Sequence, residues 1–278
     1  NTNINLEQTE NKLTLDGSSK YLINDKLTDS IKFGINKTNE KLSFKASIDL
    51  SPLKIELNNF DYLKKRDEEA SLKFNGFINK DYLSLNEISY VNIKNFINVK
   101  GLKIENFKIT ELDNLKLDFV NKSNFRNKIS IISKNKDFQI QGKSFDINKL
   151  INKTSDNDKN LLNIFKNLNT MLSINIDEIQ LDRKNKIYNL NGDIKIKKND
   201  IYSLNLSSNF SQNEKLFLKI VTNKDKSVIT NFYSDKAEPF VKKYKFIKGF
   251  EDGHIDFQST KKNNIISSKL IIDNFKVQ

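Results

Sequence analysis

The 278-residue chain has no cysteine, no tryptophan and only one histidine. Without cysteine it has neither a disulfide framework nor a thiolate that could attack a substrate or bind a metal. One histidine excludes histidine-based metal clusters, and only His254 could serve as the base of a Ser-His-Asp triad. His254 stands two residues before Asp256 in a strand-like segment, so we expect an exposed strand histidine rather than a catalytic one.

Glycine and proline are also scarce, with eight and two residues respectively. The glycines are isolated, and none belongs to the phosphate-binding pattern G-x-x-x-x-G-K. Acidic pairs such as Glu68-Glu69 and Asp177-Glu178 lack a recognisable acid/base spacing. We therefore expect no catalytic residue, no metal site and no cofactor, and the chain does not read as an enzyme.

Acidic residues are outnumbered, 35 against 47 lysines and arginines, which gives a formal charge of +12. Such a charge attracts phosphates of nucleic acids or lipid headgroups. The lysines are nevertheless scattered, and Lys, Asn and Ile are abundant together, as an AT-rich genome would produce. One aromatic and basic stretch, Phe240 to Phe250, has its aromatics at helical core spacing. We expect no nucleic-acid partner, and a basic helix facing lipid headgroups is the better functional interpretation of that stretch.

Long apolar runs are absent: no stretch of eighteen apolar residues occurs, and no signal peptide is visible. The chain starts at Asn1 inside a strand pattern, and its only methionine is Met171. We therefore expect a piece of a longer protein whose membrane anchor would lie upstream.

What the chain does have is alternation with a period of two. Leu42, Phe44, Ala46, Ile48 and Leu50 form one such row, and similar rows recur along the chain between turns rich in Asn, Asp and Lys. This pattern is typical of antiparallel strands with one apolar and one wet face. It predicts a mainly β fold: a long antiparallel meander with two or three short helices.

Three segments have helical spacing. The clearest places Leu161, Leu162, Phe165 and Leu168 on one face. A second is expected near Glu238 to Phe246, where Pro239 suits a first turn, and a weaker one near Phe60 to Glu69. In a mostly β chain we expect such helices to close an end or an edge of a sheet.

The segment Glu238 to Gln278 combines a short helical patch, a strand that starts between Gly249 and Gly253, a polar turn and a last strand. The last strand ends in Ile-Asp-Asn-Phe-Lys-Val. An internal echo relates Val99–Ile109 to Ser267–Val277, both with Asn-Phe-Lys followed by a β-branched residue. This echo is interpreted either as a repeated strand unit or as convergence of two bent strands.

This closing segment resembles the final hairpin of AsmA-like proteins. The resemblance extends back over Gln141–Ile151, which is similar to a family motif with an apolar-Asp-apolar core. It also includes Val228–Val241, which is similar to the family's strand that leads into a short helix. It covers about half the chain, and Lys236-Ala237-Glu238 departs from the family's small residues.

The resemblance implies the following expectations. The chain, residues 1–278, is one continuous segment of a longer envelope protein, with possible sub-units 1–140 and 141–278. Its meander coils into an elongated open groove that is apolar inside. An upstream helix anchors it in the inner membrane of a Gram-negative bacterium, and it lies in the periplasm. It carries phospholipid between the inner and outer membranes and serves outer-membrane biogenesis.

Alternation in the better-matching half predicts the groove lining, which phospholipid acyl chains would contact. The predicted lining consists of Leu204, Leu206, Phe210, Leu216, Leu218, Ile255, Phe257, Leu270 and Ile272. A sandwich or solenoid with a filled core, serving as a structural or adhesive envelope module, is the alternative that periodicity leaves open.

The strand count predicts an extended particle. About eighteen strands stacked at ~4.8 Å give one sheet of roughly 85 Å. A compact globule of this length has a radius of gyration near ~19 Å, and we expect small-angle scattering to give a clearly larger value. A radius at the compact figure would favour the sandwich.

Overall fold

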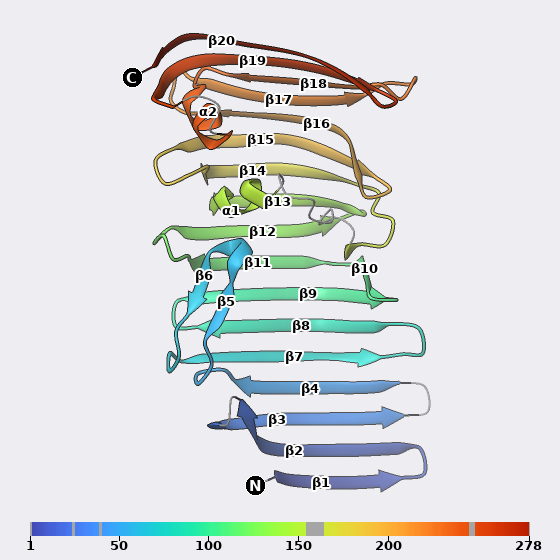
Figure 1. Cartoon of the computed structure of the whole chain (residues 1–278). Coiled ribbons are helices and arrows are strands. Elements are labelled where there is room, and N and C mark those ends of the chain that lie inside the picture. The colour runs from blue at the N-terminus through green and yellow to red at the C-terminus, as the bar shows by residue number, and fades with distance from the viewer. Residues whose placement is uncertain (1, 24–25, 39–40, 154–163, 245–247, 278) are drawn as a thin grey trace. The chain divides into compact units, whose positions relative to one another are not determined.

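In the computed structural model, residues 2–23, 26–38, 41–153, 164–244 and 248–277 are described, and the chain is mainly β (Figure 1). It divides into two compact units. The first unit comprises residues 1–133 and 159–166, and the second comprises residues 134–158 and 167–278.

The first unit is an antiparallel sheet of consecutive strands joined by short turns (Figure 1). Its strands are β1 Thr2–Thr9, β2 Lys12–Ile23, β3 Lys26–Thr38, β4 Leu42–Asp49, β7 Ala70–Ile78, β8 Leu83–Asn92, β9 Asn95–Glu105, β10 Lys108–Glu111, β11 Asn114–Val120 and β12 Arg126–Lys134. Between β4 and β7 the chain forms a second, two-stranded sheet from β5 Ile55–Leu57 and β6 Tyr62–Lys64, joined by a 3₁₀ turn at Asn58–Phe60.

The second unit carries a mixed sheet and two short helices. Its elements are β13 Asp137–Asp146, α1 Asn148–Lys153, β14 Thr170–Gln180, β15 Lys186–Lys197, β16 Asp200–Asn209, β17 Lys215–Thr222, β18 Val228–Ser234, α2 Glu238–Tyr244, β19 Phe250–Lys262 and β20 Ile265–Val277. The strands β13 and β14 run parallel, with Ile140 opposite Ile174. The expectation of a purely antiparallel meander is therefore wrong at this point, because a long connection through α1 returns the chain to the starting end of β13.

Cross-strand register aligns the alternating residues into rows that cross each sheet. We call one such row the first unit's apolar ladder, and it consists of Ile4, Gly17, Phe33, Ala46, Phe74, Ile88, Val99, Leu115 and Ile131. Successive members face each other across neighbouring strands, so they share one face of the sheet. The absence of a side chain at Gly17 leaves room for Phe33, whose ring tip would lie 2.6 Å from a Cβ there.

Asparagine and lysine pairs make the tight turns, as predicted. Lys198 and Asn199, between β15 and β16, both have left-handed backbones, with φ of 52° and 66°. Asn135 and Lys136 adopt the same conformation, with φ of 54° and 71°. Two consecutive left-handed residues form the turn whose twist matches a two-residue hairpin.

The helix near Glu238 is confirmed as α2, and residues 245 and 246 of its predicted span lie outside the described residues. The prediction of a helix over Phe60 to Glu69 is wrong. Asp61 and Asp67 there have left-handed backbones, with φ of 51° and 62°, which interrupt a helix, and Tyr62 to Lys64 form β6 instead.

The helix predicted around Leu161 to Leu168 is only partly testable, because residues 161–163 lie outside the described part of the chain. Beyond them the helical prediction is wrong: Phe165 forms an isolated bridge to Ile109, and Leu168 is not helical. The backbone N–H of Lys166 also bonds the carbonyl of Ile109 at 2.9 Å. Pairing with β10 supplies hydrogen bonds that a helix would otherwise provide.

The internal echo does not correspond to a repeated structure. In the first copy, Asn106 and Phe107 both have positive φ, of 48° and 59°, and they turn the chain from β9 into β10. In the second copy Asn274 has a φ of 51°, and β20 continues through it. One left-handed residue bends a strand, whereas two in succession reverse it.

Gly192 on β15 tests how closely β15 and β16 pack in the second unit. Its φ is +146°, and a Cβ there would lie 1.9 Å from the carbonyl oxygen of Asn205 on β16. We expect Gly192→Ala to lower the free energy of unfolding by about 2 kcal/mol or more, because the backbone must shift. Chemical denaturation measures this change. Ser207→Ala, on the neighbouring strand, is the control, and equal stability of the two variants would contradict this packing.

Candidate functional site

Four of the nine predicted lining residues lie in one row across the second unit. This row, the second unit's apolar ladder, consists of Ile140, Ile174, Gly192, Leu206, Leu218, Phe232, Phe257 and Leu270. It reaches every strand of that unit's sheet. The sequence reasoning identified Leu206, Leu218, Phe257 and Leu270 but missed Phe232, which completes the row between β17 and β19. The sequence signal for Phe232 was the alternation of Val228, Thr230 and Phe232, in which the polar Thr230 interrupts the apolar pattern.

The other predicted lining residues flank this ladder. Leu204 lies opposite Ile220 on one side of it. On the other side, Ile255 lies opposite Ile272 on β20 and opposite Ser234 on β18. Ser234 in turn lies opposite Leu216 on β17. The alternation therefore placed Leu204, Leu216, Ile255 and Ile272 on strands and side by side, whereas Phe210 lies just past the end of β16.

Helix α2 covers three of the nine residues, and four others form a group that it does not cover. Ala237, Val241, Phe250 and Ile255 form a buried cluster against which Phe232, Phe240 and Ile272 pack. Phe240 of α2 makes edge-to-face contacts with the rings of Phe232 and Phe210, at centroid distances of 4.8 and 6.4 Å. Phe210, Ile255 and Ile272 thus belong to a filled core under α2.

The uncovered group extends away from α2 along the ladder. Leu206, Leu218 and Phe257 are half-buried and do not belong to the cluster under α2. Leu270, on the last strand, is 50% exposed. Within the described residues, this apolar face thus combines a packed core under α2 with side chains that water reaches. The remaining two predicted lining residues, Leu204 and Leu216, lie outside the α2 cluster and are buried.

The first unit repeats this arrangement with a different cover. Tyr62 of β6 stacks edge-to-face on Tyr90 and Phe119 of the main sheet, at centroid distances of 6.3 and 5.5 Å. The hydroxyl oxygens of Tyr62 and Tyr90 lie 2.8 Å apart, and Tyr62 donates to the Asn92 side chain at 3.0 Å. Burial raises the pKa of both tyrosines, so both hydroxyls stay protonated.

Lys64 anchors this β5–β6 cover. Its side chain is fully buried, and its ammonium donates to the carbonyl oxygens of Ser51, Leu53 and Lys65 at 2.7, 2.7 and 2.9 Å. Burial lowers the pKa of Lys64, while nearby acidic side chains, Glu68 foremost, act in the opposite direction. Because all three bonds go to backbone carbonyls of the same excursion, the lysine holds that loop in shape.

The single histidine has the position expected of it. His254 lies in β19 with its side chain 43% exposed, and its Nδ1 is 3.3 Å from a carboxylate oxygen of Asp235. Burial acts to raise the pKa of Asp235, but hydrogen bonds outweigh it and the pKa lies below its ordinary value. The Tyr233 hydroxyl and the backbone N–H of Lys215 are the main donors. Here the carboxylate of Asp235 lies between the Tyr233 hydroxyl and His254. In a catalytic triad the histidine lies between the nucleophile and the acid, so this arrangement is not a triad.

Across the described ranges, no three His, Cys, Asp or Glu side chains are grouped so that they could hold a metal ion. No described helix is long and apolar enough to cross a membrane. Comparison with protein-family models, curated protein sequences and solved structures finds no match. The apolar sheet faces are the candidate functional surface.

The covered and uncovered groups should respond differently to charge. We expect Ile255→Asp, under α2, to lower the free energy of unfolding by about 3 kcal/mol, because the carboxylate would be buried without a partner. Leu270→Asp, on the same face, should leave the melting temperature almost unchanged because its side chain is 50% exposed. Thermal unfolding of both variants decides this. A large loss at Leu270 would mean that the whole face is packed core.

Proposed function

We propose that the apolar faces of the two sheets bind acyl chains of phospholipids, and that the chain is a non-enzymatic segment of an AsmA-like envelope protein. In this proposal it lies in the periplasm, attached to the inner membrane through an upstream helix. It helps phospholipid to pass between the inner and outer membranes. The observation that carries the proposal is the second unit's apolar ladder, which is closed by α2 in one part and uncovered in the rest.

The length of each ladder supports this function. The second unit's apolar ladder spans seven inter-strand spacings of about 4.8 Å, or roughly 34 Å. One leaflet of a bilayer contributes about 15 Å of hydrocarbon, half of a ~30 Å core. An acyl chain could therefore lie along the ladder and shift from strand to strand without leaving it.

The chemistry of the ladder also fits a ligand without directional demands. Its members are aliphatic or phenylalanine side chains and one glycine, so none of these side chains requires a hydrogen bond from the ligand. Each methylene removed from water contributes about 0.8 kcal/mol, whichever part of the strip it contacts. Such binding does not favour one position of the acyl chain along the strip. Movement along a groove requires this lack of preference.

The alternative is a structural or adhesive envelope module with a filled core. It is favoured by one observation, the packed clusters beneath α2 and beneath β6. In that case the uncovered ladder residues would be covered by a further segment or partner rather than by lipid. The two functions predict opposite behaviour of charged substitutions in the uncovered part.

We expect Leu206→Asp and Phe257→Asp to remain folded and to lose lipid. In an open face the carboxylate stays hydrated, while its charge interrupts the apolar strip. The measurements are thermal unfolding, phospholipid that co-purifies with the protein, and uptake of a fluorescent long-chain fatty acid. Lipid content and uptake should fall severalfold relative to the unmodified chain.

Matched controls come from the opposite face of the same strands. Ser207→Asp and Gln258→Asp add the same charge one residue further along β16 and β19, and they should keep the lipid. Equal loss from both faces would show a charge effect rather than a groove. Unfolding of the ladder variants, or an unmodified chain that never takes up lipid, would support the structural module.

A further inference from the structure

The face of the first unit opposite its apolar ladder carries a second row with a distinct chemistry. We call it the lysine ladder, and it consists of Asn3, Ser18, Lys32, Ser47, Lys73, Ser89, Asn98, Lys116 and Ser130. Its residues precede or follow those of the apolar ladder by one position, so they point to the other side of the sheet. The row contains three lysines and no acidic residue.

One neighbouring row on this polar face balances its own charges. Lys45 pairs with Asp16 at 3.7 Å, and Lys100 pairs with Glu87 at 3.6 Å. Glu87 also accepts a hydrogen bond of 2.8 Å from Asn98, and its pKa lies below the ordinary value because of Asn98 and then Lys100. The carboxylates of Asp16 and Glu87 therefore already have interaction partners other than the lysines of the lysine ladder.

Lys32 and Lys73 have no such partner. Within the described part of the chain, no carboxylate forms an ion pair with either ammonium group. They stand on β3 and β7, on either side of Ser47 on β4, so their backbones are roughly 10 Å apart. The flexible four-carbon stem of lysine lets both ammonium groups converge above the serine hydroxyl.

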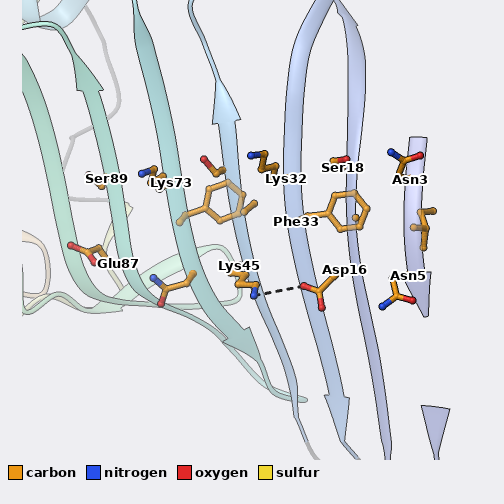
Figure 2. A pocket seen from close by; sticks show the side chains of 16 residues that line it. Asn3, Asn5, Asp16, Ser18, Lys32, Phe33, Lys45, Lys73, Glu87 and Ser89 are labelled. Carbon is orange, nitrogen blue, oxygen red and sulfur yellow. Dashed lines mark ion pairs between the residues drawn. The ribbon is translucent and has the colours of Figure 1, made fainter. Parts of the chain in front are cut away.

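A hollow of about 910 Å³ lies over this part of the ladder (Figure 2). Its lining includes Ser18, Lys32, Ser47, Lys73 and Ser89, together with members of the neighbouring polar row such as Lys45 and Glu87. Ile4, Phe33, Ala46 and Phe74 of the first unit's apolar ladder also border it, because they alternate with the polar residues along the same strands. The members of the lysine ladder that border the hollow alternate between hydroxyl and ammonium donors from Ser18 to Ser89.

We infer that this hollow binds a phosphate group, held over Ser47 between Lys32 and Lys73. Two ammonium groups neutralise the phosphate charge, and the hydroxyls of Ser47, Ser18 and Ser89 donate to its remaining oxygens. The volume exceeds what a bare phosphate fills, so the group belongs to a larger molecule. The inference uses the ammonium and hydroxyl groups of the lysine ladder, whereas the proposed acyl-chain function uses the apolar side chains, so it does not rest on that function.

Calorimetry tests the inference with inorganic phosphate and with glycerol 3-phosphate at constant ionic strength. We expect Lys32→Gln/Lys73→Gln to weaken binding by about tenfold or more, because two charge-assisted hydrogen bonds are lost. Ser47→Ala should weaken it by a smaller factor, and Lys32→Arg/Lys73→Arg should retain it. Added salt should weaken binding throughout because both lysines are exposed.

The control is Lys195→Gln/Lys219→Gln, which removes the same charge from two exposed lysines of the second unit. It should bind phosphate like the unmodified chain.

Cosedimentation with phosphatidylcholine vesicles, with and without phosphatidylglycerol, identifies the source of the phosphate. If the chain binds only the anionic vesicles, and Lys32→Gln/Lys73→Gln abolishes this binding, the phosphate belongs to a lipid headgroup. If the two double variants behave alike in every arm, the ladder is a solvated basic face and the inference is overturned. Fatty-acid uptake should be unaffected by Lys32→Gln/Lys73→Gln, which separates this result from failure of the proposed function.

Discussion

The structure depends on cross-strand register combined with the two-residue alternation of a β-strand. Each strand sends successive side chains to opposite faces, and the backbone hydrogen bonds decide which residues of neighbouring strands meet. A slip of one residue would move a whole strand's apolar set to the wet face. The turns and bulges that set register therefore matter as much as the apolar residues. At Gly76 a bulge lets Leu85 and Ile88, three residues apart on β8, both align with the apolar side.

Given these aligned faces, short excursions of the chain decide where the core forms. The β5–β6 excursion covers the first unit's face around Tyr90 and Phe119, and α2 covers the second unit's face around Ile255. Both excursions bring aromatic rings onto the sheet: Tyr62 of β6 is almost completely buried there, and Phe240 of α2 is partly buried. What they leave uncovered is the same kind of surface without a packing partner, and this is why one face can supply both stability and a proposed binding strip.

The two faces of the first unit's sheet have separate chemistry because adjacent residues in a strand never share a face. The apolar ladder through Phe33 and Phe74 and the lysine ladder through Lys32 and Lys73 use neighbouring positions of the same strands. Hydrophobic burial acts on one of them, and screened electrostatics and hydroxyl donors act on the other. Substitutions on one face can therefore be made without changing the chemistry of the other.

The sequence by itself determined the mainly β class, the alternation of apolar and wet faces, the Asn- and Lys-based turns and helix α2. Each of these follows from local geometry that a few neighbouring residues specify. It also brought Leu206, Leu218, Phe257 and Leu270 together as one candidate surface, because alternation fixes the face on which each residue lies.

Tertiary structure decided everything that depends on which strands meet and what covers them. The parallel pairing of β13 and β14, the fold of Phe60 to Glu69 as an excursion rather than a helix, and the place of Phe232 in the ladder all follow from long-range hydrogen bonds. Burial of Ile255 and Ile272 under α2, with Leu270 left exposed, depends on where a helix docks. The lysine ladder is spread over nine strands, so no local pattern could reveal it; only the register gathers its members into one row.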